Sequence, residues 1–119
     1  MAAVPSDWEV VRRDSLTVGD TAEPYRIQLV NSNGPIDLTG CTVSFRMVLL
    51  SETLEVKIGD ESADIDDAAN GLVRYDWRDI DVDTADVYAA WFIREDGDGK
   101  TERIPQGARY MRIRFAEAL

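Results

Sequence analysis

Carboxylates are the most abundant side chains in this sequence that could take part in chemistry. The 119 residues include 23 Asp and Glu, against 13 Lys and Arg and no histidine, so the formal net charge is −10. Thirteen of the acidic residues lie between positions 60 and 98, where three arginines oppose them. Clusters of oxygen ligands bind Ca²⁺ when their spacing matches that of a calcium loop.

The acidic cluster does not have that spacing. One stretch alternates like the first ligands of a calcium loop, at Asp60, Ser62, Asp64 and Asp66. Its sixth position, however, holds Ile65 where a calcium loop has glycine, and its twelfth holds Gly71 where the loop has glutamate. A second acidic stretch, 96–102, has glycines at the wrong offsets and is predicted to be a hairpin turn. We therefore expect a solvated acidic face and no metal ion.

The remaining residues give little support for catalysis or for a cofactor. Cys41 is the only cysteine, so one chain can form neither an internal disulfide nor a multi-cysteine zinc site. The lack of histidine removes the usual pairs of nucleophile and base. Among 23 acids, some pair always lies close enough to suggest a glycosidase, so such a pair carries no information. We predict a non-enzymatic protein without a cofactor, in which Cys41 is a small core or strand-edge residue.

Basic residues gather near the two ends of the chain. They are Arg12, Arg13, Arg109, Arg112 and Arg114. Chain termini often lie close together in folded domains, so these side chains are predicted to form one positive patch on a negative molecule. Such a charge distribution favours head-to-tail packing with copies of the chain or docking onto an acidic partner.

The run Val87–Ile93 is apolar on both faces. A strand of this kind is either central in a sheet and covered on both sides or lies at a contact between subunits. Trp91, in the middle of the run, is accordingly either a core residue or an interface anchor, because large aromatic side chains serve both purposes. The sequence leaves both alternatives open.

Apolar and polar residues alternate with a period of two along the whole chain, which is typical of strands with one buried face. The predicted strands cover residues 25–29, 43–49, 54–58, 73–77, 88–93 and 111–115, with a further candidate at 8–13. Turn-forming pairs such as Asn33-Gly34 and Asn70-Gly71 separate them. We predict an all-β fold, either an antiparallel β-sandwich of seven to eight strands or a small barrel. A single domain over residues 8–119 is expected after a flexible arm at 1–7.

Two classes of partner are disfavoured. No stretch approaches the ~18 uncharged apolar residues that a membrane span needs, and the amino end lacks the pattern of a secretory signal. A strongly negative domain also repels phosphate backbones. We expect no membrane partner and no nucleic acid partner.

Several short motifs follow one another along the chain. They are Gly19-Asp20-Thr21, Asp37-Leu38-Thr39-Gly40, Gly71-Leu72-Val73-Arg74-Tyr75-Asp76-Trp77 and the strand that begins at Tyr88. In this order and spacing they resemble the amino-terminal domain of the phage baseplate upper protein, a family of immunoglobulin-like β-sandwich modules in tailed-phage virions. The resemblance covers residues 8–115 and implies that fold for this chain.

The resemblance also implies a function. It predicts a non-enzymatic structural protein of a tailed-phage virion, assembled in the host bacterial cytoplasm, that serves as an assembly or adaptor module of the tail or baseplate. Its expected partners are other virion proteins, on which it docks in multiple copies or as a homo-oligomer. Two alternatives stay open: decoration of the capsid or anchoring of a head fibre, and a carbohydrate-binding module in which Trp8, Trp77 or Trp91 stacks on sugars.

Physical reasons exist for two of these motifs. In Asp37-Leu38-Thr39-Gly40, Leu38 is expected to close the end of the sandwich while Asp37 and Thr39 bond to nearby backbone groups. Gly40 supplies a backbone conformation that other residues rarely adopt. Gly71 is expected to let the chain turn sharply into the strand that carries Tyr75.

Overall fold

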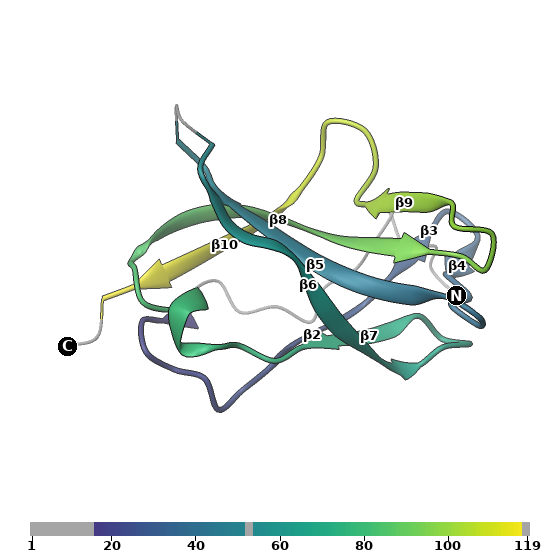
Figure 1. Ribbon diagram of the computed structural model, residues 1–119, viewed down its shortest axis with the longest axis horizontal. Coiled ribbons are helices and arrows are strands. Elements are labelled where there is room, and N and C mark those ends of the chain that lie inside the picture. The colour runs from purple at the N-terminus through teal and green to yellow at the C-terminus, as the bar shows by residue number, and fades with distance from the viewer. Residues whose placement is uncertain (1–15, 52–53, 118–119) are drawn as a thin grey trace.

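The computed structural model describes residues 16–51 and 54–117, whose regular secondary structure is β apart from one 3-10 turn (Figure 1). The elements, in chain order, are β1 (Leu16–Thr17), β2 (Tyr25–Gln28), β3 (Val30–Asn31), β4 (Gly34–Pro35), β5 (Thr42–Leu49), β6 (Val56–Asp67), β7 (Leu72–Tyr75), the 3-10 turn η1 (Asp79–Asp81), β8 (Asp86–Glu95), β9 (Thr101–Ile104) and β10 (Met111–Ala116). The all-β prediction is confirmed. In the part of the chain that is described, no helix has the length and apolar character to cross a membrane.

One curled sheet contains most of the strands. Its order is β1-β10-β8-β5-β6-β7-β2, with β9 attached to β8, and β3 and β4 form a separate pair. The pairings are antiparallel except that of β1 with β10, which is parallel. A parallel pair needs a long connection between its strands, and here nearly the whole chain lies between them. The immunoglobulin-like arrangement stays a prediction.

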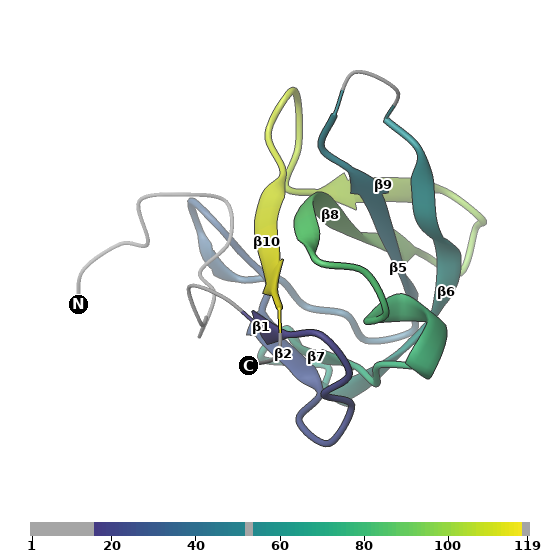
Figure 2. The same cartoon turned by 90° about the vertical axis from the view of Figure 1, so that its left-hand side faces the viewer.

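Strand β6 is the reason that the sheet curls. Its first part, up to Ala63, pairs with β5, and its last part, from Asp64, pairs with β7. The register of β6 shifts near Asp60, whose φ of 58° is left-handed, and such irregularities increase the twist and bend of a strand. As a result β7 and β2 form one wall that faces a second wall of β10, β8 and β5 (Figures 1 and 2).

Aromatic side chains fill the space between the two walls. The ring of Phe45 on β5 lies 4.6 Å from that of Tyr75 and 4.9 Å from that of Phe92, between ring centroids. Trp77 packs edge-on against Phe115 at 5.3 Å and is 6% exposed. Burying each of these side chains contributes roughly 2–3 kcal/mol. The inward positions of the predicted alternation thus form the core.

Several boundaries differ from the expectations. The predicted strand 54–58 is too short, because β6 continues to Asp67 through the acidic stretch. Here small or half-buried residues such as Ala63 point inward, so the hydrophobic alternation is weak although the strand pairs on both edges. Strand β9 was not predicted. The candidate strand 8–13, with Trp8, Arg12 and Arg13, and the arm 1–7 lie outside the described residues.

The motif residues lie in turns and in the core. Leu38 is fully buried, while the Asp37 carboxylate accepts hydrogen bonds from the Thr39 backbone N–H at 3.0 Å and from the Thr39 hydroxyl at 2.6 Å. Gly71 has a φ of 67°, and a Cβ there would lie 2.5 Å from the Leu29 carbonyl oxygen. Only glycine fits such a close backbone approach.

The turn after β1 contains the first motif. The Gly19 N–H donates to the Val82 carbonyl at 2.8 Å, and the Asp20 N–H donates to the Thr17 carbonyl at 3.1 Å. Thr21 follows, half-buried. These bonds tie the start of the described chain to the loop that follows η1.

Candidate functional site

The outer face of the wall β10-β8-β5 carries a row of arginines. On β10, Met111, Ile113 and Phe115 are buried, so Arg112 and Arg114 between them point away from the core and are exposed. The register places Arg112 opposite Ala89 and Arg114 opposite Val87 on β8. The alternation of one strand therefore produces both the core side and the charged side of this wall.

Trp91 lies on the same outer face, in the middle of β8. It is half-buried, and its indole Nε1–H donates a hydrogen bond to the carbonyl oxygen of Arg109 at 2.9 Å. The guanidinium carbon of Arg103 on β9 lies 4.8 Å from the centroid of the indole ring, a cation–π distance. The ring of Tyr110 meets it nearly edge-on at 6.3 Å. Trp91 is thus held in one orientation at the surface.

Five arginines lie on or border the outer face that carries Trp91, and we call this surface the basic face. With Trp91, its members are Arg46, Arg103, Arg109, Arg112 and Arg114. Arg46 is opposite Trp91 on β5 and forms a loose ion pair with Asp60 at 3.5 Å. Within residues 16–51 and 54–117, no carboxylate pairs with Arg103, Arg112 or Arg114. The whole chain carries −10 and these five arginines +5, which leaves −15 for all other residues.

The outer side of the other wall has the opposite sign. Arg74 on β7 binds Asp64 and Asp66 on β6, each at 2.8 Å, and Asp76 at 3.2 Å. One guanidinium is shared by three carboxylates, and those of Asp64 and Asp76 remain 58% and 62% exposed. We call this group the acidic face. Because the two walls pack their inner sides together, the basic and acidic faces point away from each other (Figure 2).

A buried carboxylate lies at η1, close to the core. Asp81 is fully buried and accepts hydrogen bonds from the Tyr75 hydroxyl at 2.7 Å and from the Arg78 backbone N–H at 2.8 Å, while the Arg78 guanidinium donates at 2.8 and 3.2 Å. Burial, and after it the bond to Asp81, raises the pKa of Tyr75 far above its ordinary value. A carboxylate so fully bonded holds the chain between β7 and β8 in place.

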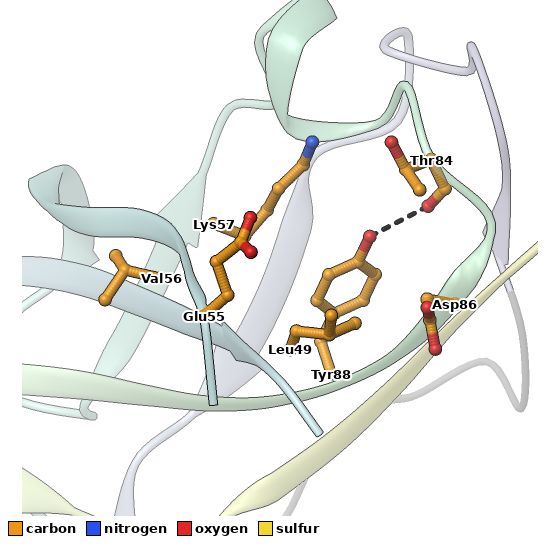
Figure 3. Close-up of a pocket in the computed structure, with 7 residues that line it drawn as sticks. All are labelled: Leu49, Glu55, Val56, Lys57, Thr84, Asp86 and Tyr88. Carbon is orange, nitrogen blue, oxygen red and sulfur yellow. Dashed lines mark hydrogen bonds between the residues drawn. The ribbon is translucent and has the colours of Figure 1, made fainter. Parts of the chain in front are cut away.

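A small pocket opens at the end of the sheet, beside the loop before β8 (Figure 3). Its volume is about 90 Å³, and its lining residues are Leu49, Glu55, Val56, Lys57, Thr84, Asp86 and Tyr88. The Tyr88 hydroxyl donates to the Thr84 carbonyl at 2.9 Å. The Lys57 ammonium binds the neighbouring Asp83 carboxylate, which lowers the pKa of Asp83. The pocket is smaller than typical ligand sites of about 300–1,000 Å³, and its polar groups brace the loop.

Of the candidate interface residues, Trp91, Arg112 and Arg114 share one outer face, Arg109 contacts Trp91 through its backbone carbonyl, and Arg12 and Arg13 lie outside the described part. Sequence reasoning missed Arg46 and Arg103. Arg46 alternates with buried residues of β5, which is a usable signal, whereas Arg103 belongs to the unpredicted β9. Trp77 is buried and therefore is no longer a candidate for stacking on sugars in the carbohydrate-binding alternative. In the described part of the chain, no group of three or more Asp, Glu, Cys or His side chains is arranged to hold a metal ion.

Fold and surface together define an all-β protein whose most distinctive feature is a charged outer surface. The model of the BppU N-terminal domain family matches residues 13–104, and the chain belongs to this family, which confirms the resemblance. The family name implies a phage baseplate structural protein, and hence a virion component. The match ends before β10, so Arg109, Arg112 and Arg114 lie beyond the matched residues.

Comparison with curated proteins finds no match. Among solved structures, CopC from Methylosinus trichosporium OB3b is similar, with 11% sequence identity and a TM-score of 0.48, over 88% of this chain and 84% of that chain. Similarity at this level carries no functional argument.

Proposed function

We propose that this chain is a non-enzymatic assembly or adaptor module of a phage tail or baseplate, which docks onto other virion proteins in multiple copies through the basic face. Assembly takes place in the host cytoplasm, and the finished protein resides in the virion. The observation that carries the docking role is Trp91, held at the surface of the basic face on a molecule that is otherwise strongly negative.

The chemistry of the basic face suits protein recognition. Tryptophan, tyrosine and arginine are the residues most enriched among those that dominate binding energy at interfaces. The Trp91 ring is already oriented by the Arg109 carbonyl and the Arg103 guanidinium, so little side-chain entropy is lost when a partner covers it. Arg112 and Arg114 lack carboxylate partners in the described residues and are available for bidentate bonds to a partner's carboxylates.

Two alternatives have less support. A sugar that stacks on Trp91 needs an open ring face, whereas the Arg103 guanidinium lies over the indole ring. The family name favours the baseplate over the capsid as the place of attachment. We therefore prefer the tail or baseplate to head decoration.

The test is incorporation into particles. A phage that lacks the gene is complemented with the wild-type chain or with the double variant Arg112→Glu, Arg114→Glu, and purified particles are examined by quantitative mass spectrometry. We expect the wild type in the particles and at least a tenfold loss of the double variant, because two arginine contacts become repulsive.

A matched control changes the net charge equally. Arg26→Glu with Lys100→Glu gives −14, as the test variant does, but at exposed positions outside the basic face. This control is expected to incorporate normally. Particles without the wild-type chain would overturn the proposed virion role, and normal incorporation of a folded Arg112→Glu, Arg114→Glu variant would overturn the role of the basic face.

A further inference from the structure

We propose that the partner of the basic face is the acidic face of a second copy of this chain, so that copies associate head to tail. This inference rests on the proposed function, because it names the partner of the same surface. Every copy of the chain carries both faces, so the chemistry of this partner is known.

The charged groups of the two faces complement each other. The basic face offers the guanidinium groups of Arg103, Arg112 and Arg114, which have no carboxylate partner in the described part of the chain. The acidic face offers Asp64 and Asp76, which are more than half exposed. Guanidinium and carboxylate groups form short paired hydrogen bonds when brought into contact.

The carboxylates of the acidic face are preorganised by Arg74. Arg74 fixes Asp64, Asp66 and Asp76 around its guanidinium but neutralises only one of the three charges. Each carboxylate has two oxygens and several lone pairs, so those that Arg74 binds can still accept bonds from outside. Preorganised carboxylates lose less side-chain entropy on binding than free ones.

Two copies that each carry −10 repel each other, but salt limits the range of this repulsion. The molecule measures 41 × 33 × 29 Å, so the centres of two touching copies lie roughly 30–40 Å apart. Salt screens exposed charges beyond about 10 Å at 0.1 M. Under these conditions the overall repulsion is largely screened, while groups in direct contact across the interface still attract.

The two faces belong to opposite walls and point away from each other (Figure 2). A contact between two different surfaces of the same chain is heterologous, so it leaves one free face at each end. Repetition of this contact gives a closed ring or an open chain of copies, depending on the rotation per step.

Analytical ultracentrifugation of the full chain in 0.1 M salt tests the inference. We expect wild-type self-association that weakens at 1 M salt, where the screening length falls to about 3 Å. The basic-face variant Arg112→Glu, Arg114→Glu and the acidic-face variant Asp64→Lys, Asp76→Lys are each expected to weaken self-association roughly tenfold to a hundredfold. The equal-charge control Arg26→Glu, Lys100→Glu leaves the arginines of the basic face intact. Because Arg26 lies opposite Arg74 on β2, its replacement makes the acidic face more negative, so this control is expected to associate at least as strongly as the wild type.

Mixing the two defective variants gives the sharpest result. The variant Arg112→Glu, Arg114→Glu keeps an intact acidic face. The variant Asp64→Lys, Asp76→Lys keeps an intact basic face, so these two intact faces can still bind each other. A head-to-tail contact therefore predicts monomers in each separate sample and association in the mixture, either as heterodimers or, where the reversed Glu and Lys faces also pair, as longer alternating chains. Monomers in the mixture, or association of either variant alone at wild-type strength, would overturn the inference; circular dichroism of each variant excludes unfolding as the cause.

This outcome is separable from the particle experiment. If the wild type stays monomeric while Arg112→Glu, Arg114→Glu is lost from particles, the head-to-tail contact is wrong and the docking role stands. If the wild type associates but is absent from particles, the proposed virion role is wrong and the head-to-tail contact stands.

Discussion

Replacement of Asp81 by alanine is expected to destabilise the protein strongly, although this residue lies far from the basic face. Asp81 is fully buried and accepts hydrogen bonds from Tyr75 and from the backbone and side chain of Arg78. Its removal leaves the hydroxyl of Tyr75, itself 2% exposed, without its acceptor. A buried polar group that loses its partner costs about 1–3 kcal/mol.

The expected total follows from the remaining contacts. The Arg78 backbone N–H also loses its acceptor, which adds about 1 kcal/mol. The Arg78 guanidinium is 42% exposed and can turn to water, so its lost ion pair adds little. The sum is about 3 kcal/mol, at the lower end of the 3–5 kcal/mol that follows when a buried pair is broken. For a domain of this size this corresponds to a fall in Tm of roughly 10 °C.

Urea denaturation followed by tryptophan fluorescence and circular dichroism measures the change, because the Trp77 ring lies 5.4 Å from that of Tyr75. Asp79→Ala, at an exposed position of the same turn, serves as the control and is expected to cost less than about 0.5 kcal/mol. Tyr75→Phe alone is expected to cost about 1 kcal/mol.

The double variant Asp81→Ala, Tyr75→Phe tests whether these two residues stabilise the fold through their mutual hydrogen bond. With Asp81→Ala already present, Tyr75→Phe removes a stranded hydroxyl and is expected to be neutral or stabilising. An Asp81→Ala cost below about 1 kcal/mol, or single-variant costs that simply add in the double variant, would show that the buried network does not hold this turn.

Two further predictions concern the turns. Gly71→Ala places a Cβ 2.5 Å from the Leu29 carbonyl oxygen in a left-handed conformation, so we expect the free energy of unfolding, measured in urea, to fall by at least about 2 kcal/mol. Gly40→Ala, at a left-handed position with open space around it, is the control. An equal cost for both variants would contradict the clash at Gly71. Hydrogen bonds from the Thr39 hydroxyl, and after it the Thr39 backbone N–H, lower the pKa of Asp37 below 3.8. The stabilisation is therefore complete above about pH 4 and is lost as the pH falls through the lower folded-state pKa. Thr39→Val should thus lower Tm near neutral pH and differ less from the wild type near pH 2.5, whereas a constant difference would argue against the linkage.

The sequence by itself determined which side of the clearly alternating strands faces the core. Strand side chains alternate with a period of two, so buried Met111, Ile113 and Phe115 require that Arg112 and Arg114 point outward. The hydrogen bonds of the turn could also be predicted from the sequence, since Asp37 and Thr39 are only two residues apart. The family motifs likewise lie in contiguous stretches, so the order and spacing of residues along the chain are enough to reveal the resemblance.

Only the tertiary structure decided which outward residues lie together. Strand neighbours are set by pairings between distant segments, and these place Arg46 opposite Trp91 and bring Arg103 over the indole ring. The burial of Asp81 likewise depends on where η1 packs, because neighbouring carboxylates of the same stretch are exposed. The net charge of −10 is a property of composition, whereas its separation into a basic and an acidic face arises because the sheet curls at β6 and turns its two outer sides in opposite directions.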